Sequence, residues 1–293
     1  MPRLSVLMPV RNAEALVGHA VRSSLRSMPR DAELVVWDDA STDDTIGAVD
    51  AIGDRRIRIL RSDVALGPGG AMRELCERTD SELVARMDAD DVSLPWRFAV
   101  QPATLKSTEW EILFAPVVRF ESGSARVRLS APVSIPPTMV PLHLAVMCTV
   151  MQPTMLARRS ALVAAGGYRD VRASDYDLWL RAAAAGVQMG RSSLAVVAYR
   201  RHPGQFSFVP GYISAQATPT FVEAYREFAR HVLGIETAWT AGSPVESVEQ
   251  QRSLNDIRQV LEREADHAGA LQGRLLRRTM RHLPTGRSDY ATV

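Results

Sequence analysis

Three aspartates are crowded into the segment R-M-D-A-D-D at positions 86–91, directly after an apolar run. Asp88 and Asp90 are separated by one small residue, so their carboxylates offer two hard oxygen ligands at one place. Mg²⁺ and Mn²⁺ prefer carboxylates combined with phosphate groups and water. The pattern therefore predicts a divalent-cation site for a phosphate-bearing ligand, with room beside Ala89 for a nucleotide ribose. The alternative is a polar turn whose aspartates cap the next helix.

A second acidic segment, D-D-A-S-T-D, occupies positions 38–43 and also follows an apolar run. A carboxylate such as that of Asp39 can accept a hydrogen bond from the imide N–H of uracil or thymine, which would select a pyrimidine nucleotide. Ser41, Asp43 and Asp44 are expected to cap the helix that follows. The two interpretations are compatible, because Asp39 would read the base and Ser41 would cap the helix.

The elements that must position these aspartates alternate along the first hundred residues. Short apolar runs predict strands, and segments with helical spacing predict the helices between them. The expected strands are 4–8, 33–37, 56–60 and 83–87, and the expected helices are 13–27, 70–78 and one that ends at Ile52. This alternation is typical of an open α/β sheet, in which ligands bind at the carboxyl ends of the strands. Both acidic segments follow a predicted strand.

The rest of the chain is less regular. After Pro95 a helix is expected to about Lys106, followed by a strand over 112–120 and a proline-containing, loop-rich segment over 122–150 that would cover the site. A short helix is expected over 175–185. The character changes near residue 206, where an amphipathic helix around 221–232 and a longer one from Val248 to before Pro284 are expected.

Composition bounds the class of protein. The chain has 293 residues, 46% of them hydrophobic, and a net charge of +2, which gives no electrostatic case for nucleic acid as the main partner. Two cysteines cannot form a disulfide framework or a thiolate metal site. The N-terminus does not resemble a signal peptide, and the longest apolar stretch, 139–151, is far shorter than the ~20 residues of a membrane span. A cytoplasmic protein is expected, with contact to the inner face of the membrane as an option.

Together these segments resemble glycosyltransferase family 2, an inverting family with the GT-A fold. The resemblance rests on S-V-L-M-P-V-R-N at 5–12 and on the two acidic segments. It continues through S-L-P-W-R-F at 93–98, P-T-M-L-A-R-R-S at 153–160, G-G-Y at 166–168, S-D-Y-D-L-W-L-R at 174–181 and Y-R-R-H-P-G-Q at 199–205. The implied fold is a mostly parallel central sheet flanked by helices, with a C-terminal helical extension. The implied domains are a catalytic domain, 1–205, with a donor-nucleotide half over 1–91 and an acceptor half over 92–205, and an extension over 206–293 with a disordered tail.

The resemblance also implies roles for individual residues. The nucleotide base would be lined by Pro9, Arg11 and Asp39. The diphosphate would be held through the metal by Asp88 and Asp90, with Asp90 as the direct ligand. Asp175 matches the family's catalytic base. The chain departs from the family at two positions. Ser174 stands where a glutamate is common, and Arg73 stands where an asparagine is usual, so that Arg73 is expected near a phosphate or the sugar.

Three further side chains in the second half have competing interpretations. Inverting transfer needs a base for the acceptor hydroxyl, and one carboxylate, that of Asp175, would suffice; otherwise Asp175 or Ser174 is the N-cap of its helix. His202 would be a third metal ligand or a diphosphate contact, or else structural. Trp179 would form a wall for the acceptor or the sugar, or else belong to the core.

The predicted function is transfer of a sugar from a nucleotide-diphosphate donor, a UDP- or dTDP-sugar, to a hydroxyl group in glycan or glycoconjugate biosynthesis, with Mn²⁺ or Mg²⁺ as cofactor. The acceptor would be a glycan, a lipid-linked molecule or a small molecule. The alternatives are a sugar-1-phosphate nucleotidyltransferase and a non-catalytic scaffold that acts through its C-terminal helices. The first would need a glycine- and arginine-rich N-terminal loop, where this chain has P-V-R-N at 9–12.

The C-terminal segment R-L-L-R-R-T-M-R-H at 274–282 combines apolar and basic side chains at helical spacing. Such a helix can lie in a membrane interface, or it can pack on the catalytic domain or on a second copy. The apolar stripe is narrow and lacks tryptophan. Packing or a homodimer is therefore favoured over membrane attachment.

Overall fold

The computed structural model of the chain describes residues 3–122, 126–202, 205 and 218–284. Its main sheet has the strand order β10-β6-β9-β4-β1-β2-β3. The strands are β1 (Leu4–Val10), β2 (Glu33–Asp39), β3 (Ile57–Ser62), β4 (Leu83–Arg86), β6 (Ile112–Phe114), β9 (Leu156–Arg158) and β10 (Met189–Arg191). Within the described part of the chain, β9 is the one strand of this sheet that runs antiparallel to its neighbours. The mostly parallel α/β sheet predicted from the sequence is confirmed.

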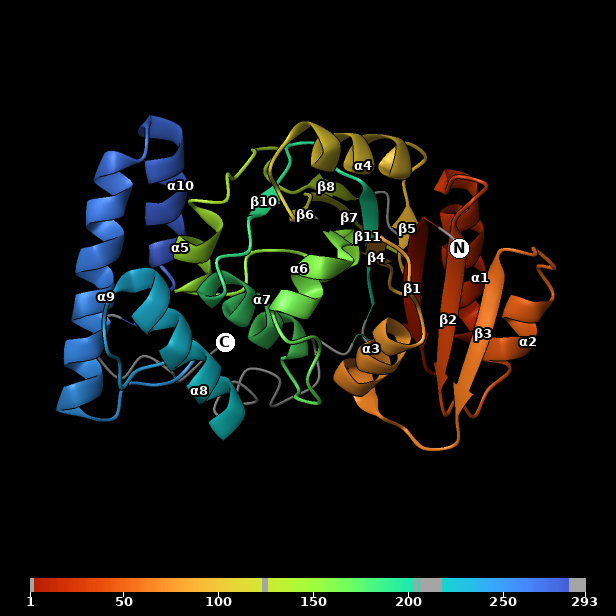
Figure 1. The fold of residues 1–293 in the computed structure, drawn as a ribbon, viewed down its shortest axis with the longest axis horizontal. Coiled ribbons are helices and arrows are strands. Elements are labelled where there is room, and N and C mark those ends of the chain that lie inside the picture. The colour runs from red at the N-terminus through yellow and green to blue at the C-terminus, as the bar shows by residue number, and fades with distance from the viewer. Residues whose placement is uncertain (1–2, 123–125, 203–204, 206–217, 285–293) are drawn as a thin grey trace.

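Helices cover both faces of this sheet (Figure 1). Those that come before the C-terminal region are α1 (Glu14–Ser27), α2 (Thr45–Asp50), α3 (Gly67–Glu77), α4 (Arg97–Ser107), α5 (Val140–Leu144), α6 (Arg159–Ala164) and α7 (Ser174–Ala184). The strands alternate between two apolar layers: Leu7 and Val35 belong to the cluster that contains α3 and α7, whereas Val6 and Val36 belong to the cluster that contains α1 and α4. Successive side chains of a strand point to opposite faces of the sheet, so one apolar run contributes residues to both layers.

The strand predicted over 112–120 is two strands in two sheets, so that prediction was wrong in part. β6 ends at Phe114, and β7 (Val117–Glu121) begins after Pro116, which has no N–H to donate to a ladder. β7 joins a second sheet of order β5-β11-β7-β8, whose other members are β5 (Val92–Ser93), β11 (Val197–Arg201) and β8 (Val127–Leu129). β5 directly follows Asp91, so the second sheet begins where the acidic segment ends.

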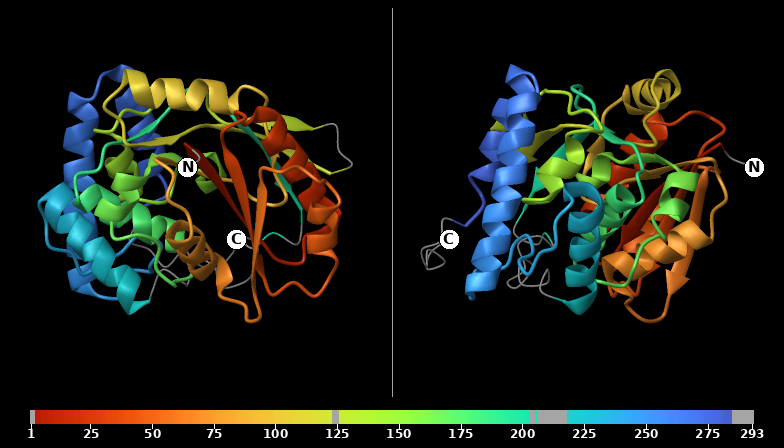
Figure 2. Two further views of the ribbon diagram at one scale, coloured as in Figure 1. Left: turned by 45° about the vertical axis from the view of Figure 1, so that its right-hand side comes forward. Right: turned by 60° about the vertical axis from the view of Figure 1, so that its left-hand side comes forward.

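The C-terminal region forms α8 (Pro219–Phe228), a π-helical turn (Ala229–Leu233), α9 (Val248–His267) and α10 (Ala270–Met280). The single long helix expected here is broken at Ala268, which has extended backbone, and Gly269. Figures 1 and 2 show these helices together at the end of the molecule remote from β2 and β3. Apolar residues of all three join the same cluster as the sheet and α7; they include Phe221, Leu254, Leu261, Leu276 and Met280.

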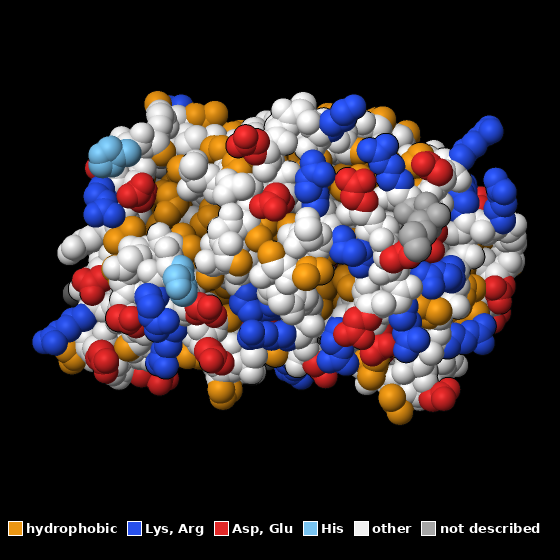
Figure 3. Space-filling model, viewed as in Figure 1, with side chains coloured by type: hydrophobic (Ala, Val, Ile, Leu, Met, Phe, Trp, Pro, Cys, Tyr) orange, Lys and Arg blue, Asp and Glu red, His pale blue; other side chains and the backbone are white. Residues whose placement is uncertain are grey.

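Leu276 and Met280 are therefore buried within the chain, as the packing interpretation predicts. That leaves the homodimer and the membrane contact as predictions. The predicted division at residue 206 and the predicted disordered tail lie outside the described residues. Of the residues that the structure describes, no helix combines the length and the hydropathy that a membrane span requires. Acidic and basic side chains are interspersed over the face seen in Figure 3.

Candidate active site

A cleft of about 530 Å³ opens at the carboxyl ends of β1 and β4. One side is formed by residues 9–13, Leu16, Pro68 and the segment that contains Arg86, Asp88 and Asp90. The other side is formed by residues 148 and 150–153, by Arg172, Ser174 and Asp175, and by Tyr199, His202 and Gln205. Six of the predicted site residues line this cleft: Pro9, Arg11, Asp88, Asp90, Asp175 and His202. Sequence segments far apart along the chain thus meet at one place.

The acidic cluster lies in this region. The cluster consists of Asp88, Asp90 and Asp91. Each contributes one carboxylate oxygen, and these three oxygens lie within 4.8 Å of one another. Asp91 is fully buried, and its Oδ1 accepts a hydrogen bond from the backbone N–H of Arg200 at 2.9 Å. Its Oδ2 is buried without a hydrogen-bond partner among the described residues. A buried, half-satisfied carboxylate beside two others is costly unless positive charge offsets it, and the guanidinium groups of Arg97 and Arg200 supply part of that charge.

The electrostatics of the cluster fit a divalent cation. Burial raises the pKa of Asp88, and burial together with the neighbouring carboxylates of Asp88 and Asp90 raises the pKa of Asp91 well above its usual range. Arg86, whose Nη2 lies 2.6 Å from Oδ1 of Asp88, offsets part of the effect on Asp88. Crowded carboxylates resist simultaneous ionisation, and a bound cation removes that resistance. The oxygen donor set is the one that Mg²⁺ and Mn²⁺ prefer.

Strand β11 holds the cluster in place from the second sheet. Nε of Arg200 donates to the backbone oxygen of Asp90 at 2.8 Å, and Nε2 of His202 lies 2.9 Å from Oδ2 of the same residue. His202 therefore lies beside the cluster, where it can orient Asp90 or share a ligand with it. Its predicted role as a third metal ligand stays a prediction.

Asp175 lies in the first turn of α7 and faces the cleft. The N-cap position of this helix is Ala173, and no side chain caps it, so the alternative in which Ser174 or Asp175 is the N-cap was wrong. Burial raises the pKa of the Asp175 carboxyl, with hydrogen bonds from backbone N–H groups acting against it. A carboxylate with a raised pKa in a cleft is suited to accept a proton.

Asp39 is placed differently from the expectation that it lines a base-binding surface. The residue is 4% exposed, and its two carboxylate oxygens accept hydrogen bonds from the backbone N–H groups of Leu66 (2.7 Å) and Gly67 (2.9 Å) at the start of α3. It does not line the cleft. The carboxylate thus stabilises the N-terminus of α3, and its reading of a base stays a prediction.

Ser41 does not cap the helix that follows it, so that prediction was wrong. Its Oγ accepts from the backbone N–H of Asn12 at 3.0 Å, which joins the loops after β1 and β2. Asp43 serves the start of α2 instead, because its Oδ1 accepts from the backbone N–H of Thr45 at 3.1 Å.

Arg73 and Trp179 are not part of the cleft lining. The wall predicted for Trp179 was wrong and its core interpretation is confirmed, whereas a contact of Arg73 with a phosphate or the sugar stays a prediction. Arg73 forms ion pairs with Glu74 (3.9 Å) and Glu77 (4.0 Å) along α3. Trp179 is fully buried and packs edge-on against Phe114, with ring centroids 4.9 Å apart. It lies one turn beyond Asp175 on α7, where the helix has entered the core.

Sequence reasoning missed several lining residues. Arg86 carried a readable signal, because it stands two residues before Asp88 at the end of a strand, where side chains two apart point to one side. Arg172 carried none. The wall formed by Cys148 and residues 150–153 was expected only in general terms, from the loop-rich segment over 122–150 that would cover the site. Arg11, Arg86 and Arg172 bring three guanidinium groups to a cleft that Asp88 and Asp90 of the acidic cluster also line.

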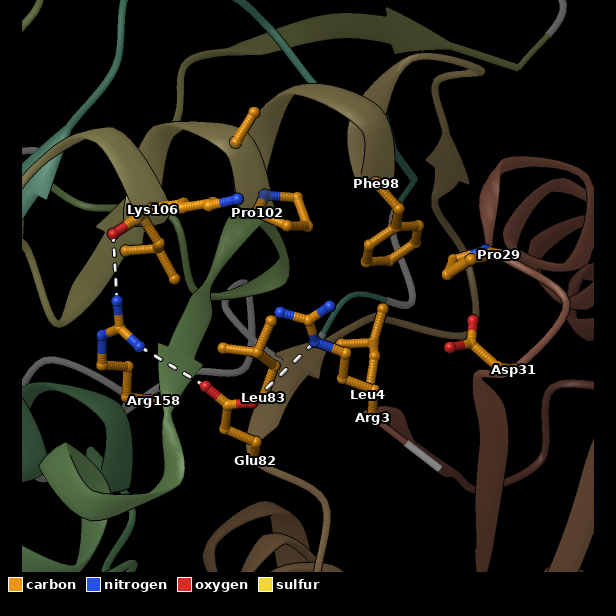
Figure 4. Close-up of a pocket in the computed structure, with 12 residues that line it drawn as sticks. Arg3, Leu4, Pro29, Asp31, Glu82, Leu83, Phe98, Pro102, Lys106 and Arg158 are labelled. Atoms are coloured by element: carbon orange, nitrogen blue, oxygen red, sulfur yellow. Dashed lines mark hydrogen bonds and ion pairs between the residues drawn. The ribbon is translucent and has the colours of Figure 1, made fainter. Parts of the chain in front are cut away.

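A second cavity, of about 460 Å³, lies at the opposite edge of the sheet, near the amino ends of β1 and β4 (Figure 4). Leu4, Leu83 and Phe98 form its apolar floor. The carboxylate of Glu82 lies between Arg158 (3.6 Å) and Arg3 (3.9 Å), and Asp31 and Lys106 also line the cavity. This cavity holds none of the predicted site residues.

Gly69 determines how closely α3 approaches the loop before α7. A Cβ added to it would lie 2.4 Å from the backbone oxygen of Arg169 and 2.9 Å from Cβ of Ser174. We expect Gly69→Ala to push this loop away and to displace Asp175. Overpacking of this kind costs about 1–3 kcal/mol of unfolding free energy, which thermal or denaturant unfolding would measure. An activity assay should show a loss larger than this change in stability explains.

The matched control is Gly269→Ala, because a Cβ at Gly269 meets nothing within 4 Å. That variant should react like the parent protein and lose only about 1 kcal/mol of stability or less, because Gly269 is the N-cap of α10. Equal behaviour of the two alanine variants would show that the close approach at Gly69 does not position Asp175.

Comparison with known proteins agrees with this geometry. The model of glycosyl transferase family 2 matches residues 5–148. A protein named for glycosyl transfer, EpsE of Bacillus subtilis (strain 168), is 28% identical over 188 residues, which are 61% of this chain and 66% of that protein. The Escherichia coli UDP-Glc:alpha-D-GlcNAc-diphosphoundecaprenol beta-1,3-glucosyltransferase WfaP is 24% identical over 207 residues, which are 71% of this chain and 80% of the relative.

Among solved structures, S. aureus TarS 1–349 in complex with UDP-GlcNAc superimposes with a TM-score of 0.63 at 16% identity. The match covers 96% of this chain and 82% of that one. At this identity the likeness concerns the fold. It spans the C-terminal helices as well as the sheet.

Proposed function

Since the chain belongs to glycosyl transferase family 2, we propose that it transfers a sugar, with inversion, from a nucleotide-diphosphate donor to an acceptor hydroxyl group. The chain is a glycosyltransferase, and it has the GT-A fold that the sequence predicted. The observation that carries the proposal is the meeting of an acidic cluster and Asp175 in one cleft. Neither feature alone would distinguish transfer from simple nucleotide binding.

In this proposal one side of the cleft binds the donor and the other side binds the acceptor. Residues 1–91 provide the donor side, where Pro9 and Arg11 would line the nucleotide, and residues 92–205 provide the acceptor side with Asp175. Arg86 and Arg172 are close enough to the cleft to contact a diphosphate. The relative WfaP is named for UDP-Glc, which supports a UDP-sugar as the donor.

The proposed reaction needs one base. The Asp175 carboxylate accepts the proton of the acceptor hydroxyl while that oxygen attacks the anomeric carbon from the face opposite the leaving group. The bond from the anomeric carbon to the nucleoside diphosphate breaks, and the diphosphate leaves with the electron pair. Mn²⁺ or Mg²⁺ held by Asp88, Asp90 and Asp91 would supply the positive charge that this leaving group requires.

The acceptor is proposed to be a hydroxyl group of a growing glycan, in polysaccharide or glycoconjugate biosynthesis. Two relatives, WfaP and a Campylobacter jejuni beta-1,3-glucosyltransferase, are named for acceptors linked to undecaprenol. A lipid-linked acceptor would bring the protein to the cytoplasmic face of a membrane.

A panel of nucleotide sugars tests the donor assignment. With Mn²⁺ present, UDP-Glc or UDP-GlcNAc should raise the unfolding temperature by several degrees, because a ligand at 100 times its Kd adds about 2.7 kcal/mol of stability. GDP-Man should have a smaller effect if the site selects a pyrimidine. The stabilising donor should also be hydrolysed slowly, with water as the acceptor.

Addition of EDTA is the control for the metal. Stabilisation that persists unchanged in EDTA would contradict the cation site, and the absence of any effect from all donors would contradict the proposed function.

A further inference from the structure

The segment that leaves α5 lacks the hydrogen bonds that a continuing helix would supply. α5 ends at Leu144 in the interior, and the chain then turns into the cleft wall that begins at Cys148. The last carbonyl groups of a helix have no partner within it, and buried ones must find another donor. Two phenol groups meet this need. Tyr176 donates to the backbone oxygen of Leu144, and Tyr225 donates to that of Ala145, the latter at 2.6 Å.

These donors come from different parts of the chain. Tyr176 follows Asp175 on α7, whereas Tyr225 lies on α8 in the C-terminal region, and both rings are buried. A third contact comes from α10, where Oγ1 of Thr279 lies 2.8 Å from Nδ1 of His143. Burial and the charge of Arg191 lower the pKa of His143 to about 4, so the imidazole is neutral near pH 7 and joins α5 to α10 as a neutral pair.

Aromatic packing makes these contacts one unit. Phe221 of α8 packs edge-on against Tyr176, with centroids 5.2 Å apart, and Trp239 packs edge-on against Tyr225 at 6.1 Å. Three consecutive residues, 143–145, are thus held by α10, α7 and α8 in turn. Figure 1 shows α5 between α7 and the C-terminal helices. The family match ends at residue 148, so Tyr225 and Thr279 lie beyond it.

We propose that Tyr225 and Thr279 are positioning residues through which the C-terminal helices fix the cleft wall formed by Cys148 and residues 150–153. This wall faces the donor side and adjoins Asp175. Its placement would set how closely an acceptor hydroxyl approaches the donor. The link to the acceptor rests on the proposed function, whereas the positioning of the wall does not.

Cys148 provides a reporter within the wall. The chain has two cysteines, so a Cys76→Ala background leaves Cys148 as the single thiol. Its Sγ lies 3.6 Å from the backbone oxygen of Val150, and burial raises the pKa of the thiol well above its usual range. Since the thiolate is the reactive form, an aromatic disulfide reagent should modify the native wall slowly. Any loosening of the wall should therefore speed the reaction.

The experiment compares Tyr225→Phe with Ser24→Ala in the Cys76→Ala background. Both changes remove one buried hydroxyl, but Ser24 lies on α1, in the other apolar layer, and its hydroxyl donates to the backbone oxygen of Ala20 in the same helix. Tyr225→Phe should speed modification of Cys148 by about tenfold, the ratio expected for one lost buried hydrogen bond. Ser24→Ala should leave the rate within about twofold of the parent. Equal rates in the two variants would overturn the proposal.

Thr279 supplies a second, milder pair of variants. Thr279→Val removes the hydroxyl that contacts His143 and should also speed the modification, whereas Thr279→Ser keeps the hydroxyl and should restore the parent rate. A serine variant as reactive as the valine variant would overturn the role assigned to the hydroxyl.

Binding of UDP with Mn²⁺, measured by calorimetry, should be unchanged in Tyr225→Phe, because the donor side is not touched; a loss of UDP affinity would contradict a role confined to the wall. Neither measurement requires sugar transfer. A response of Cys148 in a protein that transfers no sugar would refute the proposed function and leave the positioning role standing. Sugar transfer by a protein in which Tyr225→Phe does not change the reactivity of Cys148 would refute the positioning role and leave the proposed function standing.

Discussion

Asparagine in place of Asp175 is expected to lower the rate of sugar transfer by about 10²–10⁴-fold, the usual contribution of a general base. The amide keeps the size of the side chain but cannot accept the proton of the acceptor hydroxyl. UDP affinity in the presence of Mn²⁺ should stay nearly unchanged, because Asp175 lies on the side of the cleft opposite the proposed donor side. Release of UDP from the donor measures the rate, and calorimetry measures the affinity.

The pH dependence should identify the same group. Burial raises the pKa of Asp175, and only the ionised carboxylate can act as a base. The rate should therefore fall as the pH drops through this raised pKa and level off above it. The residual rate of Asp175→Asn should lack that dependence. Asp170→Asn, the same change at an exposed position five residues earlier, is the control; a wild-type rate in Asp175→Asn would refute the role of base.

Alanine in place of Asp90 should abolish the metal-dependent part of UDP binding, a loss on the order of 100-fold or more. The variant removes one of three clustered carboxylates and leaves His202 without its 2.9 Å partner. UDP titrated with and without Mn²⁺ should then give the same weak affinity. Asp50→Ala, at an exposed carboxylate of α2, should behave as the parent. A metal-dependent affinity that survives in Asp90→Ala would place the cation elsewhere.

The sheet could be predicted because its strands are short apolar runs bounded by polar turns. The edge at which Asp88 and Asp90 lie followed from the parallel direction of those strands. The end of the strand at Pro116 could have been predicted, since proline cannot donate a hydrogen bond within a ladder. The move of the chain into a second sheet could not be predicted, because the partner of β7 is β11, which comes eighty residues later in the chain.

The differences between the expected and the observed surroundings of Asp39 and Trp179 share a physical cause. Asp39 contacts Leu66 and Gly67 only because α3 folds back over the end of β2. Trp179 lies on a helix that is buried on nearly all sides, so no polar face marks which turn meets the cleft and which enters the core. Spacing within a segment predicts local structure. It does not predict whether a given side chain will face the cleft or the core.

The interior position of β9 in the main sheet has a consequence for synthesis of the chain. β4 pairs with β1 on one side and with β9 on the other, and β9 (Leu156–Arg158) emerges from the ribosome long after β4. Until then the strand that leads into the acidic cluster has an unpaired edge, which is a template for association with other chains. The nascent chain therefore leaves this edge without its partner strand until β9 has been made. A fragment limited to residues 5–148 would remain at that stage, because it ends before the strand that completes the sheet.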